Sequence, residues 1–173
     1  MPATPLHLGP GLFAAALLLA VADLPSLLIA SIILDVEPGS NLVLRLSGLN
    51  PPFAYHGFLH SFLGATVAAL ILAPVLLWLA QKLRNRKFFG HFWAPTAGAV
   101  LLACLVGTNL HILVDSFVNT DMQPFWPYLQ NPLLGLIPPL ELYVACLALF
   151  ILGAALLAFR LRGSRFLKPA FPK

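Results

Sequence analysis

Residues 58–80 read FLHSFLGATVAALILAPVLLWLA, a run without a single Lys, Arg, Asp or Glu. Crossing about 30 Å of hydrocarbon takes about 20 helical residues, so this run is long enough to span a membrane. Three further runs qualify, namely Leu12 to Leu34, Ala94 to Val118 and Leu140 to Phe159. The whole chain is 60% hydrophobic and only 9% charged, with a mean hydropathy of +0.90. These features predict an all-α integral membrane bundle of about four transmembrane helices, forming a single domain over residues 1–173.

The first apolar run is interrupted near its middle by Asp23-Leu24-Pro25. Asp23 could cap a new helix, and Pro25 would fit the first turn of that helix. The run therefore allows one long span or two short helices, Leu12 to Ala22 and Leu24 to Leu34. Each short helix would be about 17 Å long, too short to cross, and the two would form a re-entrant hairpin. A hairpin would return His7 to the membrane face at which the run ends, whereas a single span would place His7 across the bilayer.

The basic residues predict the orientation of the chain. Of the ten Lys and Arg residues, all but Arg45 lie between residues 82 and 87 or in the tail from Arg160 onward. By the positive-inside rule, the basic loop 82–91 and the C-terminal tail are expected on the cytoplasmic side of a prokaryotic cytoplasmic membrane. The connections 36–55 and 119–139 then fall on the opposite, outer face.

A set of polar side chains at this outer face is a candidate binding site. Two pairs are spaced four residues apart, in HGFLHS (56–61) and HILVD (111–115), and this spacing puts both side chains on one face of a helix. Two carboxylates lie in LDVEP (34–38), at the end of the first run. Buried ionisable groups are costly in a membrane protein and mark function there. The candidates are His56, His60, His111, Asp115, Asp35 and Glu37.

The donor types predict a metal and a reaction class. Imidazole and carboxylate ligands without thiolates suit zinc, or another divalent first-row metal such as manganese or iron. A bound metal would polarise a substrate oxygen and lower the pKa of its water to about 7, which makes hydrolysis the natural reaction. Glu37 and Glu141 are the candidate general bases, although Glu141 could equally be a ligand or a partner of Arg45. His91, in the basic loop, is expected outside the site.

Proline-rich sequence covers the same face. Gln123 to Pro139 contains five prolines, which break any helix there, so an ordered, non-helical lid is expected. Trp126 and Tyr128 in this segment, and Trp93 near the other face, are expected in interfacial aromatic belts. Small polar residues beside the candidate ligands could orient them or serve as helix caps and interhelical hydrogen bonds; these are Ser61, Thr108, Asn109, Ser116, Asn119 and Thr120.

Four short motifs follow one another along the chain. They are PLH ending at His7, LDVEP with Asp35 and Glu37, HGFLHS from His56 to Ser61, and HILVD from His111 to Asp115. Their order and spacing resemble the YdjM-like family of membrane-bound metal-dependent hydrolases. That family has a Thr-His or Ala-His element, a Pro-Asp-Ile-Asp-like element, a His-Arg-x-x-x-His-Ser element and a His-x-x-x-Asp element. This chain departs from it with Leu34 in place of the proline, Glu37 in place of the second aspartate and Gly57 in place of the arginine.

The resemblance implies a function and a ligand set. The family is distantly similar to zinc-dependent phospholipases C and single-strand nucleases, which are helical enzymes that hydrolyse phosphodiesters with a cluster of metals. It implies a membrane-embedded hydrolase in which a metal-activated water attacks an ester or phosphoester, such as that of a lipid, at the outer face. A re-entrant hairpin becomes preferable because it lets the N-terminal histidine join the site. The implied metal ligands are His7, Asp35, His56, His60, His111 and Asp115.

Other functions fit the same residues. The cluster could relay protons or bind a transported metal ion, and a homodimer could then supply the symmetry that four spans without an inverted repeat lack. Paired histidines could also be axial ligands of a haem, although the carboxylates beside them would be poorly explained. A purely structural membrane protein is a further alternative. The expected partners are the lipid bilayer, a lipid or phosphoester substrate and a second copy of the chain, with no sign of nucleic-acid binding.

Overall fold

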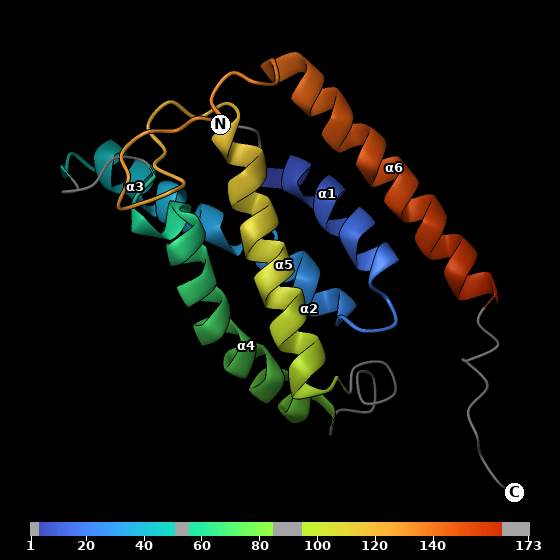
Figure 1. Ribbon diagram of the computed structural model, residues 1–173. Helices are drawn as coiled ribbons and strands as arrows, with labels where there is room; N and C mark the ends of the chain where they lie inside the picture. Colours follow the sequence, from blue (N-terminus) through green and yellow to red (C-terminus); the bar gives the residue numbers. More distant parts are fainter. Residues whose placement is uncertain (1–3, 51–55, 85–94, 164–173) are drawn as a thin grey trace, which may run out of the picture.

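The computed structural model describes residues 4–50, 56–84 and 95–163, and the regular structure in these ranges is entirely helical (Figure 1). The elements are α1 (Thr4–Leu17), α2 (Leu24–Ala30), the 3₁₀ turn η1 (Ile33–Asp35), α3 (Val36–Leu46), the 3₁₀ turn η2 (Phe58–His60), α4 (Phe62–Arg84), α5 (Ala97–Ser116) and α6 (Pro139–Gly163). Four segments are long and apolar enough to cross a membrane, namely Leu24–Leu46, Phe62–Leu83, Ala97–Ser116 and Pro139–Arg162. The predicted all-α membrane bundle with about four spans is confirmed. His91 and Trp93 lie outside the described residues.

The first apolar run folds as a hairpin of α1 and α2, with its turn at residues 18–23 (Figure 1). Asp23 caps α2, since its carboxylate accepts the N–H of Ser26 at 2.9 Å, and Pro25 lies in the first turn. The backbone N–H of Asp23 also donates to the carbonyl of Ala99 at 3.1 Å, which holds the turn against the start of α5. The two-helix alternative is therefore the one that the chain adopts.

The bounds of both short helices differ from the prediction. α1 begins at Thr4 rather than Leu12, because a proline in the first turn, Pro5, needs no hydrogen-bond partner for a backbone N–H. α2 stops at Ala30, and the chain tightens into a 3₁₀ turn in which the N–H of Asp35 donates to the carbonyl of Ile32 at 3.2 Å. In a continued α-helix that N–H would bond to Ser31. The tighter turn leaves the carbonyl of Ser31 available for a side chain.

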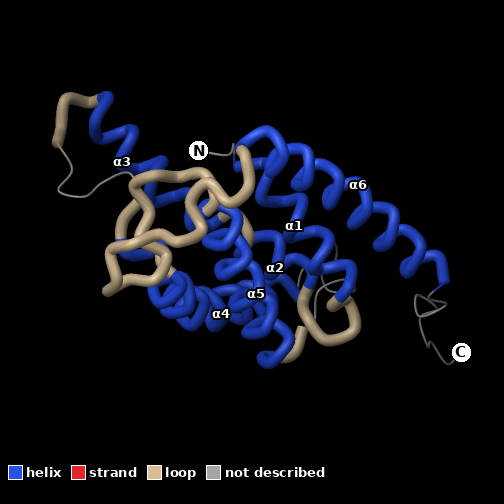
Figure 2. The backbone as a smooth tube through the Cα atoms, turned by 45° about the horizontal axis from the view of Figure 1, so that its top comes forward, coloured by secondary structure: helices blue, strands red, loops and turns tan. Residues whose placement is uncertain are grey.

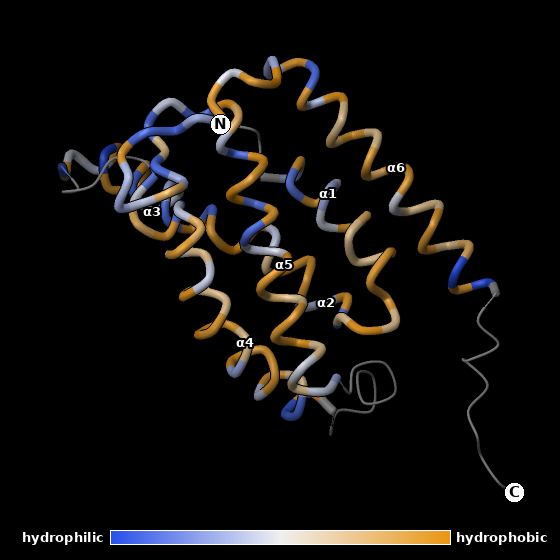
Figure 3. Tube along the Cα trace, in the orientation of Figure 1, coloured by the Kyte–Doolittle hydropathy of each residue, from blue (hydrophilic) through white to orange (hydrophobic). Residues whose placement is uncertain are grey.

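α3 corrects a second expectation. Residues 36–46 were expected in a connection outside the membrane, but they form a helix that continues from α2 and η1. The segment VEPGSNLVLRL carries its proline in the first turn, where a helix tolerates it, and ends in LVLRL, in which Leu and Arg favour a helix. Figure 3 shows hydrophilic residues gathered around α3 and the connection before α6, whereas α4, α5 and α6 are mainly hydrophobic.

Small residues bring the central helices together. α4 and α5 pack along much of their length, and α2 packs against α5 (Figure 1). Their shared core contains Ala30, Ala69, Ala73, Val100 and Cys104. At Gly107 of α5, an added Cβ would lie 2.7 Å from the Cβ of Ala30 in α2. Such close approach is how membrane helices associate when no hydrophobic effect drives them together.

α6 packs mainly against α1, at the edge of the bundle (Figure 1). Gly9 of α1 lies against the backbone of Cys146, and Gly153 of α6 lies against the backbone of Phe13. At the far end of the pair, the Arg160 guanidinium donates to the carbonyls of Ala16 and Leu17, at 2.5 and 2.8 Å. A cation at the C-terminal carbonyls of α1 is favourable because these carry the negative end of the helix dipole.

The Gly9 contact makes a prediction about stability. A Cβ at position 9 would overlap the carbonyl group of Cys146, which is backbone and cannot rotate away. Gly9→Ala is expected to lower the free energy of unfolding by about 1–3 kcal/mol, the usual cost of overpacking. Gly98→Ala is the matched control, since it is also helical but has no neighbouring atom within 4 Å of the added Cβ. Thermal unfolding in detergent measures both, and equal midpoints for the two variants would contradict the packing.

Candidate metal centre

α5 carries two of the candidate ligands as the spacing predicts. His111 and Asp115 lie one turn apart near the C-terminal end of this helix, and each is only 1% exposed. The carbonyl of Ser31, left free by the turn after α2, accepts a hydrogen bond from Nδ1 of His111 at 2.8 Å. The ring therefore carries its proton on Nδ1, and Nε2 has its lone pair available for a metal.

His56 and His60 reach the same region without a helix, which corrects the prediction that both lie on one helical face. His60 belongs to the 3₁₀ turn η2, and His56 precedes it in irregular chain. The helix starts later because Ser61 has extended backbone and caps α4, accepting the N–H of Gly64 at 3.0 Å. The two imidazoles still meet, with ring centroids 4.8 Å apart.

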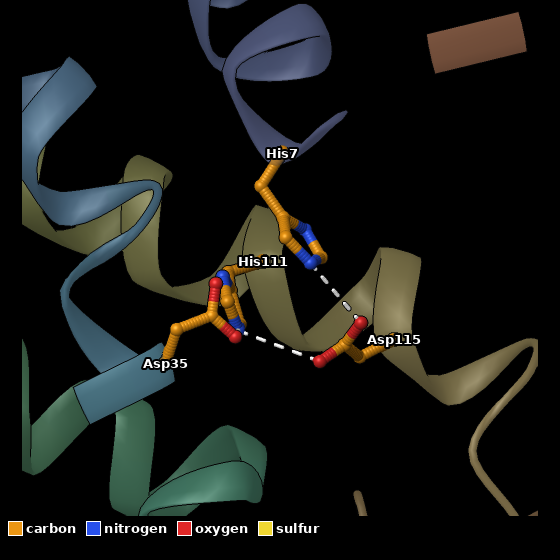
Figure 4. A group of neighbouring side chains, drawn as sticks. All are labelled: His7, Asp35, His111 and Asp115. Atoms are coloured by element: carbon orange, nitrogen blue, oxygen red, sulfur yellow. Dashed lines mark ion pairs between the residues drawn. The ribbon is translucent and has the colours of Figure 1, made fainter. Parts of the chain in front are cut away.

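The first ligand group joins α1, η1 and α5 (Figure 4). Nε2 of His7 lies 3.2 Å from Oδ1 of Asp115. Nε2 of His111 lies 3.5 Å from Oδ2 of Asp115 and 3.7 Å from Oδ1 of Asp35. The imidazoles of His7 and His111 stack at 4.0 Å between centroids. The α1–α2 hairpin thus brings His7 and Asp35 to the same end of the molecule.

The second ligand group consists of His56, His60 and Asp115, each of which offers one ligand atom within 4.8 Å of the other two. Nδ1 of His60 is 2.7 Å from Oε2 of Glu37, and Nδ1 of His56 is 2.8 Å from Oδ1 of Asp121. Each carboxylate fixes the proton on Nδ1, so that Nε2 is again the free ligand atom. Burial lowers the pKa of His60 below its ordinary value, which favours the neutral ring that binds metals.

The unpaired atoms of the site fit a metal. Of the nine buried side-chain N and O atoms without a hydrogen-bond partner in the described residues, eight belong to the two ligand groups. They include Nε2 of all four histidines and both carboxylate oxygens of Asp115. Two ligands of one tetrahedral zinc, each about 2.0–2.1 Å from the ion, lie about 3.3 Å apart. The contacts of 3.2 to 3.7 Å in the first group are close to that spacing.

Glu37 is built into the site through Gly57. Its Oε2 also accepts the backbone N–H of Gly57 at 3.2 Å. A Cβ at position 57 would lie 2.5 Å from Oε1 of Glu37, so the carboxylate occupies the space that a side chain would need. The glycine at position 57, where the family motif has arginine, therefore leaves the space that the Glu37 carboxylate occupies.

Two sets of sequence candidates remain, namely Glu141 and the small polar residues beside the ligands. Glu141 lies exposed in the first turn of α6 and belongs to neither ligand group, so the structure does not bring it to the cluster. Among the small polar residues beside the ligands, Thr108, Asn109 and Ser116 donate to carbonyls one turn earlier in α5.

Sequence reasoning missed two groups that orient the histidines, the carboxylate of Asp121 and the carbonyl of Ser31. Asp121 lies in the connection 119–139, which the charge pattern places at the outer face. Its position in the connection that covers the ligands is the signal that could have found it. The carbonyl of Ser31 had no signal in the sequence, because it is freed by the 3₁₀ turn.

The connection between α5 and α6 contains no helix and crosses the ligand end of the bundle (Figure 2). The carbonyl of Pro124 accepts the N–H of Phe62 at the start of α4, at 2.8 Å. Two ring contacts add to this, Phe58 with Trp126 and Phe62 with Phe125, at 5.2 and 5.3 Å between centroids. The segment is thus tied over α4 beside the second ligand group.

Fold and site together define an integral membrane protein of the helical class with a buried histidine and aspartate cluster at one end of the bundle. The family model of the YdjM inner membrane protein matches residues 1–168, and the chain belongs to this family. No curated protein and no solved structure matches the chain.

Proposed function

We propose that this inner membrane protein is a metal-dependent hydrolase whose histidine and aspartate cluster holds a divalent metal. The metal is zinc by donor chemistry, or else manganese or iron. The ligands are His7, Asp35, His56, His60, His111 and Asp115. The substrate is an ester or phosphoester of a lipid.

One observation carries the proposal. Nε2 of His56, His60 and His111 makes no hydrogen bond, while Nδ1 of each ring is held by an oxygen atom from another element. Holding an imidazole by Nδ1 so that Nε2 is free is what proteins do with metal-ligating histidines. A purely structural role would leave this pattern unexplained, because buried nitrogen atoms without partners are destabilising.

The chain's own residues can support hydrolysis. A bound divalent ion would polarise a substrate oxygen and lower the pKa of water. Glu37 lies next to His60 and is 19% exposed at its side chain, so it can both orient that ring and accept a proton from water. The α5–α6 connection is bonded to the start of α4 and, through Asp121, to His56, so it would limit the access of bulk water to the second ligand group.

A cavity next to the ligands favours a lipid. It has a volume of about 430 Å³ and lies between η1, α3 and α4, with Glu37 in its wall. The other lining side chains are mainly apolar and include Ile33, Leu34, Leu59 and Leu72. Because the cavity lies between two candidate membrane spans, the molecules that reach it from the side are lipids. An acyl chain in this cavity would place the ester or phosphoester near Glu37 and His60.

The charge pattern supports an orientation. α4 ends and α5 begins next to the basic loop, whereas His60 precedes α4 and Asp115 lies at the end of α5. With the basic loop in the cytoplasm, the ligand end of the bundle faces outward. The substrate would then come from the outer leaflet.

The test is hydrolysis by the purified protein in lipid nanodiscs. Fluorogenic phospholipids, with carboxylic ester or phosphodiester bonds as the reporter, are expected to be cleaved only with a divalent metal present. His60→Ala should abolish cleavage. His91→Ala, which removes the one histidine outside the proposed ligand set, is the control and should keep the activity. Failure to cleave any of these substrates while the protein holds its metal would refute the hydrolase.

Glu37 makes a separate prediction. Glu37→Gln keeps an oxygen that can accept from His60 and Gly57 but loses the base, whereas Glu37→Ala loses both functions. Metal affinity should fall about 10- to 100-fold in the Ala variant, as for other groups that orient ligands, and much less in the Gln variant. Hydrolysis should fall in both. Equal metal affinities for the two variants, measured by competition with a chelating dye, would show that Glu37 does not orient His60.

A transport function would use the same residues, but it predicts movement of a metal ion across the membrane instead of cleavage of a lipid. Transport sites lie near the middle of the membrane, at broken helices. Asp35 does lie at such a break, the turn η1 inside the candidate span Leu24–Leu46, whereas His60 precedes α4 and Asp115 lies at the end of α5. The position of these last two ligands favours the hydrolase. Flux of a divalent metal into proteoliposomes, without cleavage of lipid, would favour transport instead.

A further inference from the structure

α3 turns polar side chains toward the protein and apolar side chains away from it. Glu37 and Asn41 are four residues apart and therefore share one face of the helix. The carboxylate of Glu37 is held in the ligand cluster by two hydrogen bonds, and Asn41 is only 7% exposed. Leu42 and Leu46, on another face, are 46% and 79% exposed. A soluble protein packs an amphipathic helix the other way round, with the apolar face on the core.

α3 also differs in composition from the long helices of the bundle. α4, α5 and α6 are apolar over most of their surface, as expected of helices that cross a membrane. α3 combines an apolar face and a polar face within eleven residues. An amphipathic helix of this kind lies along a membrane interface rather than across the membrane.

α3 begins close to the level at which α5 ends. The N–H of Asp23 bonds to the carbonyl of Ala99 at the start of α5, whereas Asp35 lies 3.7 Å from Nε2 of His111 near the end of that helix. Residues 23–35 therefore already cover most of the length of α5. If α3 continued in the same direction, it would extend about 16 Å further, mostly beyond the end of α5. Its apolar face would then stand in water.

Aromatic side chains mark the interface at the start of α3. Phe58 and Trp126 lie next to each other, with ring centroids 5.2 Å apart, and both are 43% exposed. Phe58 directly follows Gly57, whose N–H bonds to Glu37 in the first turn of α3. Exposed tryptophan is typical of the depth of the lipid headgroups. The first turn of α3 is thus tied to the part of the protein that lies at this depth.

We propose that α3 lies in the plane of the membrane interface at the ligand end of the bundle and docks on the lipids of that leaflet. Its apolar face, with Val36, Val43 and Leu46, rests on the acyl chains, and Arg45 on the opposite face meets headgroups and water. Figures 1 and 2 both show α3 reaching away from the other helices. The inference does not depend on the proposed hydrolase, because it needs only a protein that spans a membrane.

The position of α3 gives the cavity of about 430 Å³ a direction. Val36, Glu37 and Ser40 of α3 line one part of it, and Ala68 and Leu72 of α4 line another. Leu72 lies about 15 Å along α4 from the start of that helix. The cavity therefore runs from the interfacial helix toward the membrane interior, so that a lipid in it would have its headgroup at α3.

The test is the depth of single spin labels on α3 in lipid vesicles. Cysteine replaces Val36, Val43 or Leu46 and is reacted with a nitroxide reagent, while the native Cys104 and Cys146 are buried. Relaxation of the label by oxygen, which partitions into lipid, and by a water-soluble nickel chelate gives its depth. We expect the three labels at one shallow depth, within about one helical turn or 5 Å of each other.

Arg45→Cys and Leu70→Cys are the matched controls. Arg45 is exposed and lies two residues from Val43, almost opposite it on the helix, so its label should be accessible to the nickel chelate. Leu70 is 55% exposed and lies about 12 Å along α4, so its label should be deeper than the labels on α3. All five positions are exposed, and the substitutions therefore leave the core unchanged.

Three results would overturn the inference. A helix that crosses the membrane would give a depth that changes by about 15 Å from Val36 to Leu46. Full access of the nickel chelate to all three labels of the apolar face would place α3 in water. Protection of these labels from both reagents would show that a second copy of the chain covers α3. Lipid cleavage is not measured, so failure of the proposed hydrolase and failure of this inference are distinguishable.

Discussion

Asp115→Asn is expected to remove metal from the protein and to reduce hydrolysis about 10³-fold, which corresponds to the several kcal/mol that a metal contributes at the transition state. Asp115 is the residue shared by both ligand groups. The amide keeps the volume of the carboxylate but loses its charge, so the fold is retained while the cluster loses its central anion. Elemental analysis and the lipid cleavage assay measure the two effects.

Ser116→Ala is the matched control for this variant. It lies one residue away and is fully buried, and its hydroxyl donates within α5 to Ile112 at 2.6 Å. Its metal content and activity should equal those of the wild type. If Asp115→Asn kept the full metal content and activity, the cluster would not be the metal site and the proposed hydrolase would lose its basis.

The helices could be predicted from the sequence because each depends on local composition. Residues 58–80 contain no Lys, Arg, Asp or Glu, so the spans followed from composition, and Asp23 with Pro25 is a local start signal that made the hairpin one of two alternatives. Where helices begin was harder, because the ends depend on single hydrogen bonds. The helix of the second span begins later than predicted, because Ser61 caps α4 after His60 rather than before it.

Which ligands meet could be predicted only in part. The spacing of His111 and Asp115 was sufficient, since both lie on one helix. His7 needed the hairpin, which local pattern left open, and the motif resemblance favoured it. Asp121 lies 65 residues from His56 in the sequence, and Ser31 lies 80 residues from His111. The contact in each pair depends on the geometry of the loops between them. No periodicity encodes such contacts.

Removing the metal is expected to lower the melting temperature of the wild type by about 10 °C. Without a cation, the eight atoms of the cluster that make no hydrogen bond are balanced only by imidazole–carboxylate contacts of 3.2 to 3.7 Å in the first group. A ligand present at about 1,000 times its dissociation constant stabilises the folded state by about 4.1 kcal/mol. In a chain of this size each kcal/mol shifts the melting temperature by about 2–4 °C. Thermal scans at one fixed rate, with and without EDTA, measure the shift.

The same scans on Asp115→Asn assign the shift to the cluster. That variant should melt at the same temperature with and without EDTA, because it has no metal to lose. Zn²⁺ added after removal of the chelator should restore the wild type but not the variant. A wild type that melts unchanged after elemental analysis has shown it to be free of metal would mean that the buried histidines and aspartates satisfy one another. The cluster would then be structural, because a folded site that tolerates metal loss without cost has no unpaired ligand atoms to offer.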